Sequence, residues 1–455
     1  MIINMPSNVN LILNELYSNK YDSYIVGGCV RDSLLGRTPN DWDICTNAKP
    51  DEMLEVFKNY KTIPTGLKHG TITIVLNGEH YEVTTYRIDG DYSDGRRPDD
   101  VEFTDDIIKD LSRRDFTINA MAYNTQNGLI DPFYGFNYLI DEYINCVGNA
   151  NDRFKEDGLR MLRAIRFATQ LDFSINLDTA EAIFQNRNLL QNISKERIRE
   201  ELNKILLSNE PSKGIKLLYA LELLDYIIPE LIPCVTFNQH NNNHNKDVFK
   251  HTLSVLDNTE PKLELRLAAL FHDIGKPNTF TMDENGNGHF YEHHKESAKI
   301  CREAMMKLKY SNKEIEYVSE LVYHHMKRYP KLRPISAKRF INKVGIDKLD
   351  DLFKLFIADR LGSKPPYDFE DIYALKNECE KVLSEKQPLS VKDLAINGHD
   401  LMEIGIPQGK MIGSILNELL EIVLENAELN TREILLEMVK MRILSRSYKN
   451  KWLIH

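Results

Sequence analysis

Two aspartates one residue apart, Asp41 and Asp43, are the side chains near the start of the chain best suited to chemistry. Alternate residues of a strand face the same side, so we expect the two carboxylates to converge. Two neighbouring carboxylates both stay ionised at low free-energy cost only when a cation lies between them. Their hard oxygen ligands favour Mg²⁺. The preceding Gly27-Gly28 leads into a short predicted helix with Arg31, where backbone N–H groups can approach a phosphate. This combination suits nucleotidyl transfer with two metal ions, although a Gly-Gly turn with solvated aspartates explains these few residues better when they are taken alone.

Four further polar residues could complete such a site. Glu82 follows the first residue of a β-branched run, so it is either a third carboxylate or a solvated strand residue. Arg113 and Arg114 stand at the predicted start of a helix, with Asp115 as its N-cap. Two guanidinium groups there could clamp a triphosphate, and a capped surface helix is the alternative.

A stripe of charged residues follows three-residue spacing along a predicted helix over residues 157–170, from Asp157 through Arg160 to Arg163 and Arg166. A solvated face is the ordinary explanation for such a stripe. However, a carboxylate and a guanidinium three residues apart can recognise a base edge, because the carboxylate accepts from an exocyclic amine while the guanidinium donates to a ring nitrogen. Cytosine and adenine present that pair, whereas guanine and uracil present the reverse. The Asp157–Arg160 pair therefore predicts acceptance of CTP and ATP and rejection of GTP and UTP.

The elements that must position these residues change in kind along the chain. β-branched runs at 71–76 and 81–86, joined by Asn77-Gly78, predict a hairpin within a mixture of strands and helices. From residue 152 onward the apolar spacing is helical. Polar breaks at 232–245 and 363–368 suggest boundaries. We predict a multidomain α+β fold with a mixed-sheet head, an all-α neck, a helical body and a helical tail, at residues 1–145, 146–231, 232–362 and 363–455.

Composition limits the class of protein. A chain of 455 residues exceeds one ordinary core, and its 42% hydrophobic and 28% charged residues are typical of a soluble globular protein. No apolar run approaches membrane-spanning length, residues 1–20 lack a signal-peptide pattern, and six scattered cysteines favour reduced thiols, so we expect a cytoplasmic location without a membrane partner. The net charge of −10 requires any nucleic-acid surface to be local. Residues 302–343 are basic with interleaved tyrosines, which suits either RNA phosphates or a solvated helical surface.

Several motifs occur together in one order, and with them the chain resembles the bacterial class II tRNA nucleotidyltransferases, the CCA-adding enzymes, and the related poly(A) polymerases. The motifs are GGCVRD with NDWD, SDGRRPDDVEF, RRDFTINAMAYN, DPFYG, EDGLRMLRAIRF and ERIREELNKIL. The resemblance implies a nucleotidyltransferase-type head, catalytic Mg²⁺ at Asp41 and Asp43, and tRNA, CTP and ATP as partners. It also implies nucleotide binding by Gly28, Arg31, Arg114, Asp157, Arg160, Arg163 and Arg166.

Two segments qualify this resemblance. The family usually has an acidic residue followed by leucine where this chain has Tyr138-Leu139, and a basic residue where it has Asn145. No site residue is therefore assigned there. The polar segment 87–100 resembles the flexible loop that helps the family switch from C to A addition. Its presence favours A addition, with an ordinary surface loop as the alternative.

A histidine-rich region follows the neck. His272-Asp273, followed by Ile-Gly-Lys, resembles the HD-domain phosphohydrolases, and His and Asp are ordinary ligands of divalent transition metals. The C-terminal sequence from PLSVKDLAINGHD onward also resembles the tail of the subgroup that carries an HD domain. The resemblance places metal ligands at His251, His272, Asp273 and Asp359, with His293 and either His324 or His325 as additions for a second metal.

Three functions are therefore in competition. The first is template-independent addition of CCA to tRNA. The second is an A-adding enzyme or a poly(A) polymerase built on the same head. The third is a metal-dependent phosphohydrolase acting on RNA ends through the HD region, with the head as a vestigial RNA-binding module, although the intact Asp41 and Asp43 speak against it. The sequence does not indicate the oligomeric state.

Overall fold

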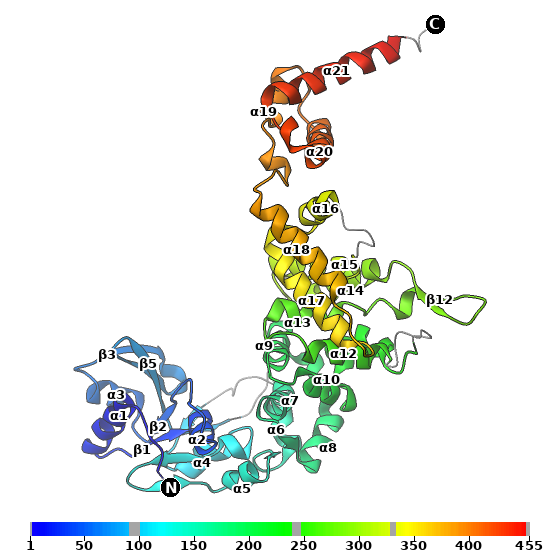
Figure 1. The fold of residues 1–455 in the computed structure, drawn as a ribbon. Helices are drawn as coiled ribbons and strands as arrows, with labels where there is room; N and C mark the ends of the chain where they lie inside the picture. The colour runs from blue at the N-terminus through cyan, green and yellow to red at the C-terminus, as the bar shows by residue number, and fades with distance from the viewer. Residues whose placement is uncertain (1, 91–100, 239–246, 328–333, 452–455) are drawn as a thin grey trace. The chain divides into compact units, whose positions relative to one another are not determined.

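The computed structural model describes residues 2–90, 101–238, 247–327 and 334–451. The chain forms two compact units. Figure 1 shows the labelled helices and strands, coloured from blue at the N-terminus to red at the C-terminus. Unit 1 comprises Met1–Ile232 with Ala304–Ser311, and unit 2 comprises Pro233–Glu303 with Asn312–His455. Among the described residues, every helix is too short or too polar to cross a membrane.

A seven-stranded mixed sheet organises the N-terminal part of unit 1. Its central strand β2 pairs antiparallel with β1 and parallel with β5, and the interior strand β1 is buried along its whole length. Asn77 and Gly78 both have positive φ, at 54° and 84°, which confirms the predicted tight hairpin turn. The strand order is β3 (Lys61–Gly66), β4 (Thr71–Leu76), β5 (Glu79–Thr85), β2 (Ile44–Thr46), β1 (Ser23–Val26), β8 (Ala122–Asn124) and β9 (Gly128–Ile130).

Short helices and a second small sheet complete this head. The expectation of a loop from residue 87 onward is wrong at its start, because β6 (Arg87–Asp89) pairs antiparallel with β7 (Val101–Phe103). Residues 91–100 of that expected loop lie outside the described residues. The helices are α1 (Ser7–Ser18), α2 (Gly28–Leu34), α3 (Pro50–Val56), α4 (Ile107–Ser112) and α5 (Gly135–Ile140).

The rest of unit 1 is helical apart from the short pair β10 (Tyr143–Ile144) and β11 (Ser174–Ile175). Its central helix is α7 (Leu159–Leu171), which packs against α9 and α10. Gly214 allows α10 to lie close to α9, because a Cβ there would stand 2.3 Å from Ile205 Cγ2. The other helices are α6 (Ala150–Glu156), α8 (Leu177–Asn186), α9 (Lys195–Leu206), α10 (Pro211–Ala220) and α11 (Leu224–Ile227).

Unit 2 is built around α13 (Leu263–Phe271), whose residues from Leu265 to Phe271 are all buried. The helices α12 (Val248–Asp257), α15 (Asn312–His324) and α17 (Leu349–Gly362) pack around it. The hairpin of β12 (Phe280–Met282) and β13 (Gly288–Phe290) precedes α14 (His293–Lys307). The remaining helices are α16 (Pro334–Val344), α18 (Glu370–Ser384), α19 (Gly398–Glu403), α20 (Lys410–Glu425) and α21 (Arg432–Lys451).

This arrangement confirms the multidomain α+β fold with a mixed-sheet head followed by helical regions. The helical spacing holds through the neck, where each predicted helix is present with small shifts at its ends. The bounds of the four predicted domains stay a prediction.

Candidate active site

A polar pocket of about 180 Å³, the head pocket, opens beside strands β2 and β5. Ile44 of β2 lies opposite Val83 of β5 in the parallel register, which makes the preceding residues Asp43 and Glu82 neighbours across the two strands. Three arginines face these carboxylates, so the pocket presents acceptors for a cation beside donors for a phosphate. Its lining consists of Val26, Asp43, Ile44, Thr71, Glu82, Thr84, Arg87, Arg113 and Arg114.

The paired aspartates precede the strand instead of lying within it. Strand β2 begins only at Ile44, so the predicted placement of Asp41 and Asp43 on a strand is wrong. They nevertheless remain electrostatic neighbours. Burial raises the pKa of Asp43, and the positive charge of Arg114 lowers it in part. The negative charges of Glu82 and Asp41 raise the pKa of Asp43 further. Neighbouring carboxylates whose charges disfavour the ionisation of Asp43 fit a divalent cation.

The glycine pair brings the chain close to Arg114. Gly27 has φ 78°, a conformation that favours glycine, and a Cβ at this position would stand 3.0 Å from Arg114 Nη1. On α2, Arg31 pairs with Asp32 at 2.8 Å and donates from Nη1 to Asn119 Oδ1 at 2.8 Å. Thus Arg114 lies between the glycine turn and the carboxylates, which is where a triphosphate would need a positive charge.

The predicted helix at Arg113 and Arg114 is wrong. Asp106 caps and starts α4 upstream, so the two arginines lie at its C-terminal end, and only one 3₁₀ turn follows. The buried Asp110 holds both guanidinium groups, at 2.9 Å from Arg113 and 3.4 Å from Arg114. Burial would raise the pKa of Asp110, but the two arginines lower it below its usual value. Sequence analysis missed this residue, because an aspartate within a short apolar helix carries no distinguishing pattern.

Asp115 is a buried anchor between head and neck instead of an N-cap. It accepts a hydrogen bond from Arg163 Nε at 2.7 Å and another from the backbone N–H of Phe116 at 2.9 Å. Burial would raise the pKa of Asp115, but the Arg163 charge and hydrogen bond, with the Arg160 charge, lower it to about 2. An ionised pair therefore links α7 to the residues that follow α4.

The arginine stripe is present on α7, but its members have different partners. Arg160 pairs with Glu156 and donates to the carbonyl of Arg113 at 3.4 Å. Arg166 pairs with Glu201 at 2.6 Å. The guanidinium carbons of Arg31, Arg163 and Arg166 lie 5.1, 5.6 and 4.0 Å from the ring centroid of Phe167. The structure therefore gathers three of the predicted nucleotide-binding arginines around one aromatic ring.

Asp157 lies outside the helix on which the stripe was predicted. It adopts an extended conformation between α6 and α7, and its Oδ1 accepts from the Leu159 N–H at 3.0 Å, so the predicted start of the helix at Asp157 is wrong by two residues. Arg197 of α9 holds Asp157 at 2.7 Å. This positioning residue was not singled out from the sequence, although it stands in the ERIREELNKIL motif.

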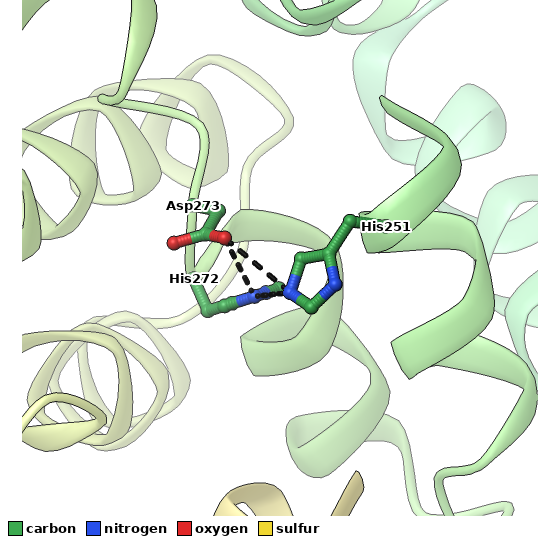
Figure 2. A group of neighbouring side chains, drawn as sticks. All are labelled: His251, His272 and Asp273. Atoms are coloured by element: carbon green, nitrogen blue, oxygen red, sulfur yellow. Dashed lines mark hydrogen bonds and ion pairs between the residues drawn. The ribbon is translucent and has the colours of Figure 1, made fainter. Parts of the chain in front are cut away.

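The HD residues form a buried cluster in unit 2. Figure 2 shows His251, His272 and Asp273 facing one another, with His251 Nε2 3.3 Å from His272 Nε2 and 3.5 Å from Asp273 Oδ2. Asp359 Oδ1 lies 3.0 Å from His251 Nε2, so the structure brings all four predicted ligands together. Lys276 pairs with Asp273 at 2.7 Å.

A second group shares Asp273 with His293 and His325, whose Nε2 atoms lie 3.3 and 3.6 Å from Asp273 Oδ1. His272, His293 and His325 each donate Nδ1–H to a backbone carbonyl, at 2.8, 2.8 and 2.6 Å. Burial lowers the pKa of His325 to about 4, so its Nε2 presents a lone pair. Lone pairs aimed at a buried carboxylate fit a divalent transition metal. Of the two histidines left open for a second metal, His325 joins the group, whereas His324 lies 3.2 Å from Glu320.

Comparisons with known proteins agree with this geometry. Residues 23–145 match the Poly A polymerase head domain, residues 172–234 match the probable RNA and SrmB-binding site of polymerase A, and residues 248–362 match the HD domain. Over 439 residues the chain is 33% identical to the CCA-adding enzyme of Ligilactobacillus salivarius, with 94% of this chain and 95% of the relative covered. The chain belongs to the family of CCA-adding enzymes.

Other CCA-adding enzymes extend the likeness. That of Lactobacillus johnsonii is 32% identical over 430 residues, covering 94% of this chain and 96% of the relative. The crystal structure of the Bacillus stearothermophilus CCA-adding enzyme in complex with CTP matches with a TM-score of 0.72 and 28% identity, covering 98% of this chain and 100% of that one. The Thermotoga maritima CCA-adding enzyme complexed with tRNA, at 24% identity and a TM-score of 0.58, shares the fold. The predicted family and enzyme class, a tRNA nucleotidyltransferase with an HD domain, are confirmed.

Proposed function

We propose that this protein completes the 3′ end of tRNA by adding C, C and A from CTP and ATP without a template. The head pocket is the observation that carries this proposal, because it places Asp43 and Glu82 beside Arg114. The neck supports it, since Arg160 of α7 reaches the backbone of Arg113 next to that pocket. The buried, reduced cysteines suit the cytoplasmic location that we propose for this reaction.

Asp41 and Asp43 would hold Mg²⁺, with Glu82 as the neighbouring carboxylate. Bound Mg²⁺ would polarise the 3′ hydroxyl and the phosphate and stabilise the departing pyrophosphate. Arg114 contributes the fixed positive charge for the triphosphate, while Gly28 and Arg31 bind it from the glycine turn and α2. Arg163 and Arg166 surround the same region from the neck and add to its positive charge.

Base selection would fall to Asp157 and Arg160. The ion pair with Arg197 holds the Asp157 carboxylate, an acceptor for the exocyclic amine of cytosine or adenine. Arg160 remains a donor whatever the pH, and Glu156 fixes its direction. Guanine and uracil would set a carbonyl against the carboxylate and an N–H against the guanidinium, which leaves buried polar groups unpaired and costs binding free energy.

Labelled CTP and ATP, supplied with tRNAs trimmed to different 3′ ends, test the proposal. We expect CMP incorporation on a tRNA that lacks CCA and AMP incorporation on one that ends in CC. AMP incorporation on the CC end alone would assign an A-adding enzyme, and long A tails would assign a poly(A) polymerase. Equal use of UTP and GTP, or no incorporation, would contradict nucleotide selection as proposed.

A second activity, metal-dependent phosphohydrolysis at RNA ends, is favoured by the buried His and Asp cluster. Asp273 is shared by both groups of candidate ligands, so Asp273→Ala should remove bound transition metal from the purified full-length protein while leaving CMP incorporation intact. Elemental analysis after dialysis against Mn²⁺ or Ni²⁺ measures the metal content.

Asp350→Ala is the matched control for this change, because Asp350 belongs to the same unit and its side chain is 66% exposed. Equal metal content in wild type and Asp273→Ala would contradict the assignment. If the wild-type protein incorporates no nucleotide but hydrolyses phosphoesters, and Asp273→Ala loses that hydrolysis, the result would favour the phosphohydrolase as the main activity.

A further inference from the structure

The β12–β13 hairpin leads directly into the HD cluster. Figure 1 shows this hairpin extending away from the helices of unit 2. At its inner end the Phe290 carbonyl accepts Nδ1–H of the cluster residue His293 at 2.8 Å. Phe290 also packs against Phe280 and Phe237, with ring centroids 5.6 and 6.4 Å away. The packed inner end of the hairpin therefore orients His293. A ligand bound at this end of the hairpin would lie next to the HD cluster.

Tyr291 is an exposed aromatic ring held in a fixed orientation. It is 69% exposed, and its ring stacks on His289 with centroids 5.4 Å apart and planes within 11°. His289 is itself held by Asp283 at 3.1 Å, which also accepts the backbone N–H of Asn287 at 2.8 Å. One face of the tyrosine is thus covered and the other is open. One residue, Glu292, separates Tyr291 from His293, which places their Cα atoms at most about 7 Å apart.

A second aromatic group with a lysine flanks the same cluster. His294, next to His293, has its ring 5.4 Å from that of Tyr323 at 62°. Lys327 Nζ lies 5.7 Å from the Tyr323 ring centroid, and Tyr323 and Lys327 stand on either side of the cluster residue His325 in sequence. The segment that carries His293 therefore also supplies the ring of His294. The segment that carries His325 supplies the ring of Tyr323 and the ammonium group of Lys327.

We propose that Tyr291 and Lys327 form a binding site for an unpaired RNA nucleotide beside the HD cluster, with the base stacked on Tyr291 and the phosphate paired with Lys327. An open aromatic face and a lysine, each two positions in sequence from a cluster histidine, suit single-stranded nucleic acid, because every base has a face to stack and every linkage carries a charge. A peptide would not need the flat, pinned ring. The site would present a phosphoester to the His and Asp cluster, and it is separate from the head pocket.

A crosslinking experiment on the full-length protein locates this binding without relying on turnover. A short single-stranded RNA carrying 4-thiouridine is bound in the presence of EDTA, irradiated, and mapped by mass spectrometry. We expect a crosslink within residues 288–295, with half-maximal yield at an RNA concentration about 5- to 100-fold higher in Tyr291→Ala. Tyr291→Phe should keep wild-type yield, because it retains the ring. Lys327→Ala should weaken the dependence of the yield on salt.

Two comparisons separate local binding from general effects. Tyr373→Ala changes another half-exposed tyrosine of unit 2, at 50% exposure on α18, and should leave the crosslink unchanged. CMP incorporation should be unchanged in Tyr291→Ala, since Tyr291 takes no part in nucleotidyl transfer. An unaltered crosslink in Tyr291→Ala, or equal losses in Tyr291→Phe and Tyr291→Ala, would overturn the proposal. Competition by CMP or AMP as strong as competition by the RNA strand would assign the site to free nucleotides instead.

Discussion

Asp43→Asn should reduce CMP and AMP incorporation by about 10³-fold, a loss of about 4 kcal/mol of transition-state stabilisation at 1.36 kcal/mol per decade. The asparagine has the same size but lacks the charge, so the remaining carboxylates bind Mg²⁺ less tightly and orient it less well. Initial rates with labelled CTP and trimmed tRNA, measured over a range of Mg²⁺ concentrations, give the effect. Higher Mg²⁺ should recover part of the lost rate.

The fold should survive this change. The raised pKa of Asp43 means that the folded protein disfavours its charge, so removing that charge should leave the thermal unfolding midpoint unchanged or slightly higher. Asp51→Asn, an exposed aspartate on α3 of the same head, is the matched control and should retain full activity. Full incorporation by Asp43→Asn at ordinary Mg²⁺ would show that the metal is held elsewhere.

The sequence predicted the strands of the head better than the environment of its carboxylates. The Asn-Gly hairpin between β4 and β5 is a local signal, because two positive-φ residues suffice to set the register. The neighbourhood of Asp43 and Glu82 depends on the parallel pairing of β2 with β5. Parallel pairing between distant segments leaves no local sequence signal, so Glu82 remained an ambiguous strand residue until the register was known.

The wrong predictions lie at the ends of helices. The RRDFTINAMAYN motif predicts Arg113 and Arg114 at the start of a helix, but Asp106 caps α4 upstream and Asp110 holds both arginines at its other end, where the helix dipole favours cations. Asp115 resembles an N-cap in sequence, yet its oxygen accepts from Arg163, which lies on another helix. A local cap and local ion pairs thus place the two arginines, whereas a tertiary ion pair places Asp115.

In the HD region the motif predicts the candidate metal ligands, and the end of helix α15 decides which of two adjacent histidines joins them. His324 and His325 are adjacent, and composition gives no reason to prefer either. Helix α15 ends at His324, and the carbonyl of Val322 accepts Nδ1–H of His325 at 2.6 Å, which turns the other nitrogen toward Asp273. Such a choice depends on one hydrogen bond at a helix end, which spacing alone does not specify.

Replacing Asp157 with alanine should relax base selection while leaving the chemical step in place. Removal of the acceptor for the exocyclic amine should lower the preference for CTP over UTP by about 5- to 150-fold, the range of 1–3 kcal/mol for one base-recognising contact. The ratio of kcat/KM values for the two nucleotides on the same trimmed tRNA measures it. A uniform rise of KM for CTP and UTP, with selection intact, would mean that Asp157 has only a structural role.

Arg197 tests whether Asp157 must be held in place to select a base. Arg197→Ala removes the 2.7 Å contact and leaves Asp157 its hydrogen bond from Leu159, so the carboxylate should be present but less fixed. We expect a smaller loss of selection than in Asp157→Ala, partly restored by Arg197→Lys. The matched control is Arg187→Ala, a neck arginine that pairs with Glu222 at 3.0 Å instead. Because Arg197 acts through Asp157, adding Arg197→Ala to Asp157→Ala should cause no further loss of selection, and a further loss in the double variant would contradict that coupling.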